Sequence, residues 1–271
     1  MAQRWPVAAF AALALLGTPA GAATIALTGT IRDFCWTAIP NVCSAHPDFE
    51  VSWTGFDPGI VATTLGTDGK PVYVGGSLPN PTTSGRANFD QWYRDTAGVN
   101  TSAPLTITLD NSSSSDPRVF VYSNNFFFPI DGMLFGDQGF SHNYHFTYEI
   151  HTTFGFLGDE VFTFTGDDDL WLFINGVLAV DVGGVHLPRT ATIDLSNPAV
   201  QALLGITPGN SYDFDLFFAE RRRTQSNFTI STTIALVPTP EASTVSLLAL
   251  AASALAPCLL RRVPRRGSPS S

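Results

Sequence analysis

The chain carries the stretch FTFTGDDDLWLFINGVLAVDVGGVH at residues 162–186. The Asn-Gly pair at 175–176 is typical of a two-residue type I′ hairpin turn, and apolar, β-branched residues flank it on both sides. We therefore predict a β-hairpin in which Ile174 pairs with Val177. The same register pairs Leu170 with Asp181. Four carboxylates, those of Asp167, Asp168, Asp169 and Asp181, are then expected at the open end of the hairpin.

Carboxylates that lie this close together repel one another unless they are solvated, protonated or bridged by a cation. Ca²⁺ suits such a loop, because it takes six to eight oxygen ligands and accepts irregular geometry. The alternative is that the three consecutive aspartates point into water and hydrogen-bond to their own backbone. The pattern is not an EF-hand, which needs a twelve-residue loop that ends in Glu.

The rest of the chain also indicates a β protein. Gly (23) and Pro (19) are frequent, and short alternating runs of apolar and polar residues recur between turn signals. At residues 144–150 and 212–218 the alternation predicts strands with one apolar face. Helical patterns are limited to residues 87–96 and 198–204, so the predicted fold class is all-β.

Two end segments have the composition of export signals. Residues 1–22 combine an arginine, an apolar run and a small-residue cleavage site, as a secretory signal peptide does. Residues 237–271 contain an apolar stretch long enough to cross a bilayer as a helix, followed by four arginines that would stay on the cytoplasmic side. These boundaries leave residues 23–236 as a single exported domain.

The charge of the chain argues against a nucleic-acid partner. The formal net charge is −9, and only 14% of the residues are charged. Without the two end segments the exported domain keeps 9 basic and 22 acidic residues, a net charge of −13. A domain of this balance lacks the basic face that nucleic-acid binding requires. Its only basic run, residues 221–223, is predicted to be a solvated loop; recognition of acidic polysaccharide and salt bridges to nearby aspartates are the alternatives.

Cysteine usage agrees with export. Cys35 and Cys43 are the only pair in the predicted exported domain, because Cys258 lies in the tail. An oxidising compartment would let them form a disulfide, and two unpaired thiols are the alternative.

Several motifs together resemble the bacterial fibro-slime domain. The stretch at 162–186 resembles its centre, and residues 142–149, 126–132 and 217–221 match further motifs in the family's order. That domain is similar to the lectin-like domain of anthrax protective antigen and of yeast flocculins. The tail, with Pro240, Glu241, an apolar helix and an arginine cluster, resembles PEP-CTERM sorting tails, which implies processing by an exosortase and a membrane-embedded stage before it.

The resemblance implies a β-sandwich or barrel and a Ca²⁺ ion that contacts sugar hydroxyls directly. It implies that two adjacent aspartates, Asp167 and Asp168, hold the ion and are joined by a cis peptide. A later loop supplies a further oxygen, for which Asn227 and Glu220 are the candidates. His186 and Trp171 are the other candidate ligand-binding residues, although a tryptophan on a strand is more often a core residue.

Other functions are open at this point. His142, His145, His151 and His186 with Glu149 suggest a zinc centre, but His145 and His151 lie too far apart along one strand to share an ion. Paired carboxylates also serve in glycoside hydrolysis, but adjacent aspartates on one loop rarely flank a sugar bond, so we expect no enzyme. The predicted function is Ca²⁺-dependent binding of extracellular carbohydrate at the cell surface, in adhesion or biofilm formation. A matrix protein with a purely structural Ca²⁺ site is the main alternative.

Overall fold

A computed structural model describes residues 23–239, and in this part of the chain the fold is all-β, as predicted. Ten strands form one antiparallel sheet in the order β7-β6-β9-β4-β1-β2-β3-β10-β5-β8. The strands are β1 Thr24–Phe34, β2 Asn100–Asp110, β3 Phe120–Asn124, β4 Phe146–Gly155, β5 Val161–Asp167, β6 Asp169–Ile174, β7 Val177–Val182, β8 Arg189–Asp194, β9 Ser211–Glu220 and β10 Asn227–Thr232.

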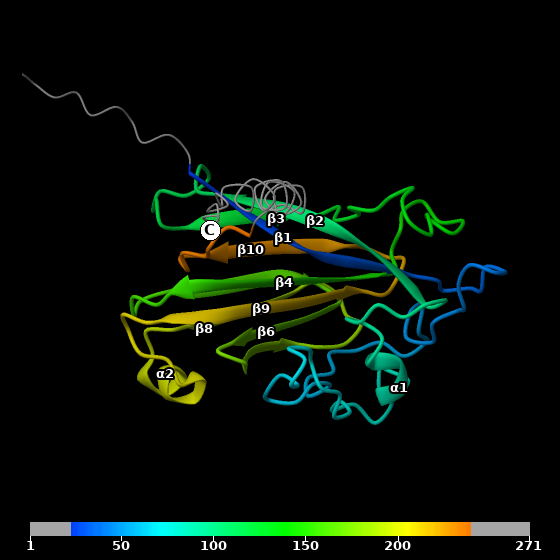
Figure 1. The fold of residues 1–271 in the computed structure, drawn as a ribbon, viewed down its shortest axis with the longest axis horizontal. Helices are drawn as coiled ribbons and strands as arrows, with labels where there is room; N and C mark the ends of the chain where they lie inside the picture. Colours follow the sequence, from blue (N-terminus) through cyan, green and yellow to red (C-terminus); the bar gives the residue numbers. More distant parts are fainter. Residues whose placement is uncertain (1–22, 240–271) are drawn as a thin grey trace, which may run out of the picture.

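The sheet curls until it almost forms a barrel. Its edge strands β7 and β8 contact each other, and the main apolar core lies inside the curl (Figure 1). The predicted alternation is confirmed on β4 and β9, which direct Tyr148, Ile150, Leu216 and Phe218 into this core. An apolar interior of this kind forms because every second side chain of a strand points to the same face.

A long excursion between β1 and β2, residues 35–99, covers the outer face of β6 and β9. It lies below these strands in Figure 1 and carries the helix α1 (Arg86–Phe89). Phe89, Trp92 and Tyr93 from the excursion pack against Trp171 and Phe217 and form a second apolar cluster. Both faces of these strands are therefore buried.

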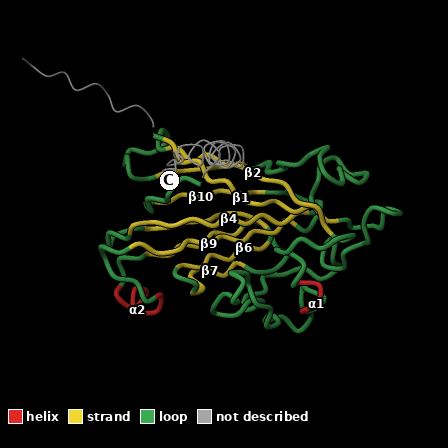
Figure 2. Tube along the Cα trace, viewed as in Figure 1, coloured by secondary structure: helices red, strands yellow, loops and turns green. Residues whose placement is uncertain are grey.

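The two helices are short and lie at opposite ends of the molecule (Figure 2). The helix predicted at residues 87–96 is shorter than expected, since α1 ends at Phe89 and turns follow it. The helix predicted at 198–204 is confirmed as α2 (Pro198–Leu204). Asn197 caps it by accepting a hydrogen bond from Ala199 N, and Gly205 ends it in a left-handed conformation.

The hairpin at Asn175 and Gly176 is present, but the predicted register is wrong beyond its second pair, Phe173 with Leu178. Ile174 pairs with Val177 as expected, whereas a β-bulge after Leu172 shifts the remaining pairs by one residue. Leu170 therefore lies opposite Val182, and Trp171 lies opposite Asp181. The extra residue keeps Val180 and Val182 in the main core with Leu170 and Leu172.

Two chain crossings meet at one end of the sheet. Asp168 is the single residue between β5 and β6, and residues 221–226 connect β9 to β10. Strand β5 pairs with β10, and β6 pairs with β9. The connection from β5 to β6 and the connection from β9 to β10 therefore both run from one of these strand pairs to the other. This topology brings the two connections together although they lie more than 50 residues apart along the chain.

The predicted disulfide is confirmed. Cys35 and Cys43 are bonded, with their Cα atoms 6.2 Å apart, just after β1. Among residues 23–239, no helix is long and apolar enough to span a bilayer. The predicted signal peptide and nearly all of the predicted sorting tail, including its apolar stretch and arginines, lie outside the described residues.

Candidate ligand site at the strand crossings

Asp167 and Asn227 face each other across the last pair of the β5–β10 ladder. Asp167 Oδ1 accepts hydrogen bonds from Asn227 N (2.6 Å) and from Asn227 Nδ2 (3.1 Å), and Oδ2 lies 3.2 Å from the same amide nitrogen. The antiparallel register thus places the amide predicted to be a ligand directly beside the first aspartate.

The peptide bond between Asp167 and Asp168 is cis, as predicted from the resemblance. The Asp168 carboxylate accepts a hydrogen bond on each oxygen, from His186 N and from Arg221 N, both at 3.1 Å. These donors belong to the segment after β7 and to the β9–β10 loop, so three chain segments hold this carboxylate in one orientation.

Asp167 and Asp168 line an open cavity of about 520 Å³. His186, one of the residues predicted to contact ligand, also lines it. The cavity is also lined by residues of the excursion, of the segment before β8, of β8 and of the β9–β10 connection, including Gly55, Leu187, Arg189, Arg222 and Thr224. The Arg189 guanidinium is stacked 4.1 Å above the Phe56 ring, which fixes its position at the rim.

The carboxylates here are buried with little compensating charge. Burial raises the pKa of Asp167, and it raises the pKa of Asp168 well above the ordinary value. Burial also raises the pKa of Glu220, and the charges of Asp168 and Asp167 raise it further. Glu220 Oε2 is a buried oxygen without a hydrogen-bond partner among the described residues. A cation at this position would offset the lost hydration of these groups.

Asp169 belongs to a different interaction. Its carboxylate is fully buried, accepts from Gly184 N, and forms an ion pair with Arg221 Nε at 2.6 Å. Burial raises the pKa of Asp169 to about 6, although Arg221 acts in the opposite direction. The side chain of Arg221 is also fully buried, so the solvated loop predicted for residues 221–223 is wrong for this residue, and the alternative of a salt bridge to a nearby aspartate is confirmed.

Asp181 also has partners of its own. It accepts hydrogen bonds from Gly59 N (2.7 Å), Trp171 Nε1 (3.0 Å) and Gly183 N (3.1 Å). The bulge in the hairpin is the reason, because it places Asp181 opposite Trp171. Within residues 23–239, no three or more His, Cys, Asp and Glu side chains are grouped to hold one metal ion. The prediction that four carboxylates converge is therefore wrong, and two of the four line the cavity.

Trp171 was a candidate for stacking against a sugar, and the structure rules out this role. Its side chain is completely buried between the sheet and the excursion, where it packs edge-on against Phe89 and lies 6.2 Å from the Trp92 ring. The burial of Trp171 follows from the excursion, which covers the strand face that a sheet of this kind would otherwise expose.

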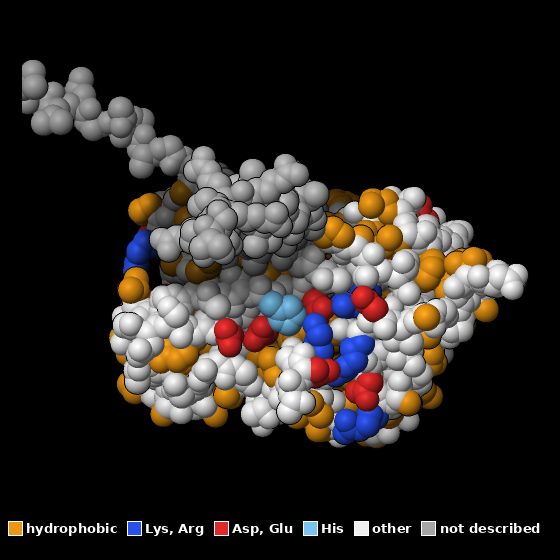
Figure 3. Space-filling model, viewed as in Figure 1, with side chains coloured by type: hydrophobic (Ala, Val, Ile, Leu, Met, Phe, Trp, Pro, Cys, Tyr) orange, Lys and Arg blue, Asp and Glu red, His pale blue; other side chains and the backbone are white. Residues whose placement is uncertain are grey.

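The remaining histidines have separate partners. His142 Nδ1 lies 2.6 Å from Asp131, and His145 Nε2 lies 3.1 Å from Glu50. Figure 3 shows a band of acidic, basic and histidine side chains across one face of the molecule. His151 is close to Asp215 and Glu149. The suggested zinc centre would need these side chains around one point, and the structure distributes them over different elements.

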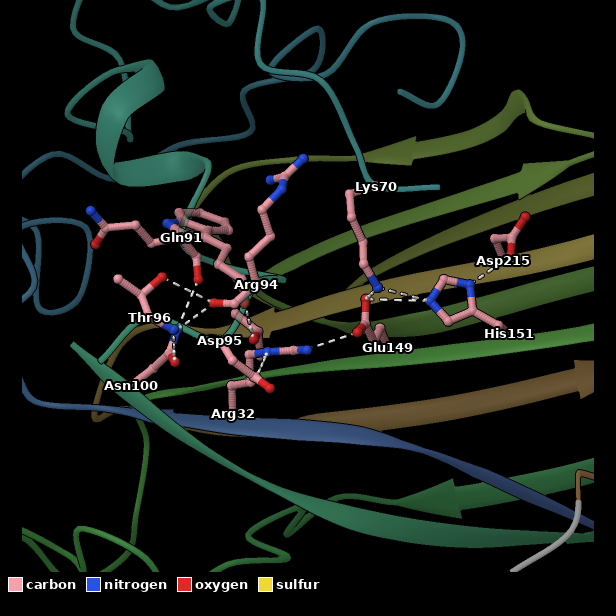
Figure 4. A network of polar contacts seen from close by, with 12 residues as sticks. Arg32, Lys70, Gln91, Arg94, Asp95, Thr96, Asn100, Glu149, His151 and Asp215 are labelled. Carbon is pink, nitrogen blue, oxygen red and sulfur yellow. Dashed lines mark hydrogen bonds and ion pairs between the residues drawn. The ribbon is translucent and has the colours of Figure 1, made fainter. Parts of the chain in front are cut away.

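Figure 4 shows how this band connects the excursion to the sheet. Glu149 on β4 accepts from Arg32 (2.8 Å) and from Lys70 of the excursion (2.6 Å). His151 Nδ1 lies 2.7 Å from Asp215 Oδ1, and its Nε2 lies 3.4 Å from Glu149. Burial alone would raise the pKa of Glu149, but His151, Arg32 and Lys70 together lower it to about 2. The network is an electrostatic connection between layers.

Comparisons with known proteins support the part of the expected resemblance that concerns the protective-antigen domain, whereas the fibro-slime domain and the PEP-CTERM tail stay predictions. Residues 136–245 match the PA14 domain. This PA14 match includes β4 to β10 and therefore both strand crossings and the Asp167–Asp168 pair.

The similarity to curated relatives extends over more of the chain than the PA14 match does. Protein psiR of Dictyostelium discoideum is 39% identical over 72% of this chain, and protein psiQ of the same organism is 37% identical over 71%. Protein psiD is 37% identical over 69% of the chain. The chain spans 20% of the length of psiR and of psiQ and 38% of psiD.

Solved structures give weaker matches. The PA14 domain of the MpAFP antifreeze protein covers 47% of this chain, with a TM-score of 0.29, 11% identity and 75% of its own length matched. A PA14 sugar-binding domain from an RTX adhesin covers 77% of this chain, with a TM-score of 0.31, 8% identity and 90% of its own length matched.

Proposed function

We propose that this chain binds carbohydrate outside the cell through a Ca²⁺ ion held beside Asp167 and Asp168. The observation that carries the proposal is that these two buried carboxylates line an open cavity, with Asn227 hydrogen-bonded to Asp167 beside it. The resemblance to lectin-like domains supplies the chemical role, in which the ion accepts sugar hydroxyl oxygens as ligands. The disulfide between Cys35 and Cys43 supports an oxidising, extracellular location.

The oxygen atoms at the site are suitable ligands for Ca²⁺. Carboxylate, amide and backbone oxygens are hard ligands, and Ca²⁺ accepts them in irregular arrangements of six to eight. Asn227 presents its amide nitrogen to Asp167 in the described structure. A half-turn of this amide would present Oδ1 to an ion between them. With two carboxylates as ligands, several coordination positions remain for water, which sugar hydroxyls can replace.

A binding function fits this arrangement better than catalysis. Hydrolysis of a glycoside needs two carboxyl groups on opposite sides of the scissile bond. Asp167 and Asp168 are adjacent in the chain and lie at the wall of the same cavity. We therefore propose a binding protein and not an enzyme.

The wider setting of the protein is part of the proposal. A signal peptide at residues 1–22 would export the chain, and a PEP-CTERM-like tail at 237–271 would pass it to an exosortase after a stage in the membrane. The fibro-slime resemblance favours a role in adhesion or in the slime matrix of a biofilm.

A glycan array, probed with the full chain in Ca²⁺ and then in EDTA, tests the proposal. We expect binding that EDTA abolishes and that excess Ca²⁺ restores. Asp167→Asn is the matching variant, because an amide oxygen still accepts from Asn227 N while the charge is removed. Asp213→Asn, an exposed change at the other end of β9, is the control.

Two results would contradict the proposal in different ways. Glycan binding that persists in EDTA would remove the ion from the mechanism. Absence of any glycan binding, combined with a Ca²⁺-dependent rise of the melting temperature, would instead support a matrix protein with a structural ion.

A further inference from the structure

A second cavity lies next to the first one. It has a volume of about 510 Å³ and is lined in part by residues 224–226 of the β9–β10 connection and by Asn227 at the start of β10. Thr224 also lines the first cavity, and Asn227 is hydrogen-bonded to Asp167. The two cavities therefore meet at Thr224, and Asn227 of the second is bonded to a proposed ion ligand of the first.

The opposite side of the second cavity is aromatic. The Phe128 and His142 rings are stacked with their centroids 4.0 Å apart and an angle of 8° between their planes. Tyr144 packs edge-on against Phe128 at 4.9 Å, and the hydrogen bond between His142 and Asp131 fixes the histidine ring. Side chains held in this way form a platform whose geometry does not depend on ligand.

Phe126 is the most exposed large apolar side chain of the described residues. It lines the second cavity, and 77% of its surface is accessible to solvent. An isolated exposed phenylalanine is common, but here it stands beside an ordered aromatic platform and a row of amide and hydroxyl groups. This combination of an apolar face with polar groups around it is typical of a small-molecule site.

The charge of the lining selects the class of ligand. No Asp, Glu, Lys or Arg lines the second cavity, whose polar groups are Asn125, Ser141, Thr224, Gln225, Ser226 and Asn227. A neutral sugar matches such a lining, since one face of a pyranose ring packs its C–H groups on an aromatic ring while its hydroxyls bond to amides. An acidic ligand would find no fixed cation there.

We propose that the second cavity is a subsite for the next sugar unit of the same glycan. One unit lies at the Ca²⁺ site, and the following unit crosses Thr224 and Asn227 to stack against Phe126 and the Phe128–His142 platform. This inference rests on the proposed function, and it makes the ligand a neutral oligosaccharide of at least two units.

Calorimetric titration of the full chain in Ca²⁺ tests the subsite. The probes are the oligosaccharide bound best on the array and the methyl glycoside of its terminal sugar. We expect the oligosaccharide to bind about tenfold more tightly, and Phe126→Ala to remove this advantage while binding of the methyl glycoside is unchanged. Leu157→Ala, which removes an equally exposed side chain outside both cavities, should change neither affinity.

A second readout is independent of affinity. Irradiation of the aromatic protons should transfer saturation to ring protons of the second sugar unit in the native chain, and less in Phe126→Ala. The subsite is wrong if Phe126→Ala binds the oligosaccharide as the native chain does, or if it weakens both probes equally. Loss of all Ca²⁺-dependent glycan binding in the native chain would overturn the proposed function itself, and the subsite with it.

Discussion

Arg221 Nε donates a hydrogen bond to Asp169 Oδ2 over 2.6 Å, and neither side chain is accessible to solvent. Arg221 also donates its backbone N–H to Asp168. Its guanidinium reaches Thr82 O of the excursion at 2.5 Å and lies 4.7 Å from the Trp92 ring. One buried arginine thus holds together both strand crossings and the layer that covers them.

Removal of Arg221 should therefore destabilise the whole fold. Arg221→Ala leaves the Asp169 carboxylate buried without a counter-ion, and loss of one partner of a buried pair costs about 3–5 kcal/mol. Urea unfolding of the full chain measures this change. The double variant Arg221→Met, Asp169→Leu should recover most of the loss, because neither member of this ion pair is then left buried without its partner. A double variant as unstable as Arg221→Ala would show that the ion pair is not the cause.

Ca²⁺ should stabilise the native chain and not Asp167→Asn. An ion that binds only the folded state adds about 2.7 kcal/mol to the free energy of unfolding when its concentration is a hundred times its dissociation constant. Melting curves in Ca²⁺ and in EDTA measure the difference. In EDTA alone, Asp167→Asn should be at least as stable as the native chain, because burial raises the pKa of this carboxyl and a neutral group avoids the penalty. An equal Ca²⁺ effect in the variant would place the ion elsewhere.

Gly166 should tolerate no side chain. A Cβ atom at this position would lie 2.3 Å from Asn227 O on the paired strand. Gly166→Ala should therefore push β10 away from β5, destabilise the fold by about 1–3 kcal/mol and weaken Ca²⁺ binding, since Asn227 moves away from Asp167. Gly155→Ala in β4 is the matched control, because a Cβ atom there meets nothing within 4 Å. Calorimetric Ca²⁺ titration and urea unfolding measure both variants.

The contribution of His151 to stability should disappear in alkali. Burial lowers the pKa of His151, but Asp215 and Glu149 outweigh it and raise the value from 6.5 to about 9. A histidine whose pKa is higher in the folded state adds stability that is fully present below pH 6.5 and lost as the pH rises through 9. The difference in unfolding free energy between the native chain and His151→Gln should follow this curve. A difference that stays constant from pH 6 to 10 would exclude the charged interaction.

The disulfide should contribute measurably to the stability of the fold, although the loop that it closes is short. Cys35 and Cys43 are eight residues apart, and the chain-entropy relation gives about 2.5 kcal/mol for a loop of this size. The variant Cys35→Ala, Cys43→Ala should unfold at a correspondingly lower urea concentration. Reductant should lower the urea midpoint of the native chain toward that of the variant, and it should leave the midpoint of the variant unchanged.

Local patterns in the sequence predicted the strands and the turn well. Alternation at residues 144–150 and 212–218 identified the inner faces of β4 and β9, and Asn175-Gly176 identified the hairpin. These signals are local, since they depend on side-chain period and turn chemistry. The bulge after Leu172 has no such signal, because it results from the fit of the hairpin to two apolar layers.

The candidate site was predictable where its residues are adjacent in the chain or belong to the motif that carries the resemblance. Asp167 and Asp168 are adjacent, and the resemblance selected them together with Asn227. A salt bridge to an aspartate was only the alternative for Arg221, because three consecutive arginines indicate a solvated loop. Thr82 and Trp92 of the excursion explain why the first of them is buried. The same excursion buries Trp171, which no pattern within residues 162–186 could have shown.

The single-residue connection at Asp168 also has a consequence for motion. Strands β9 and β10 are separated by four other strands in the sheet, yet the connection between the end of β9 and the start of β10 lines the same cavity as Asp167 and Asp168. A ligand held there would restrain the ends of two strands that no shared ladder connects. Amide hydrogen exchange should then slow at Phe218 and Phe228 together when ligand binds, a correlated response between distant parts of one sheet.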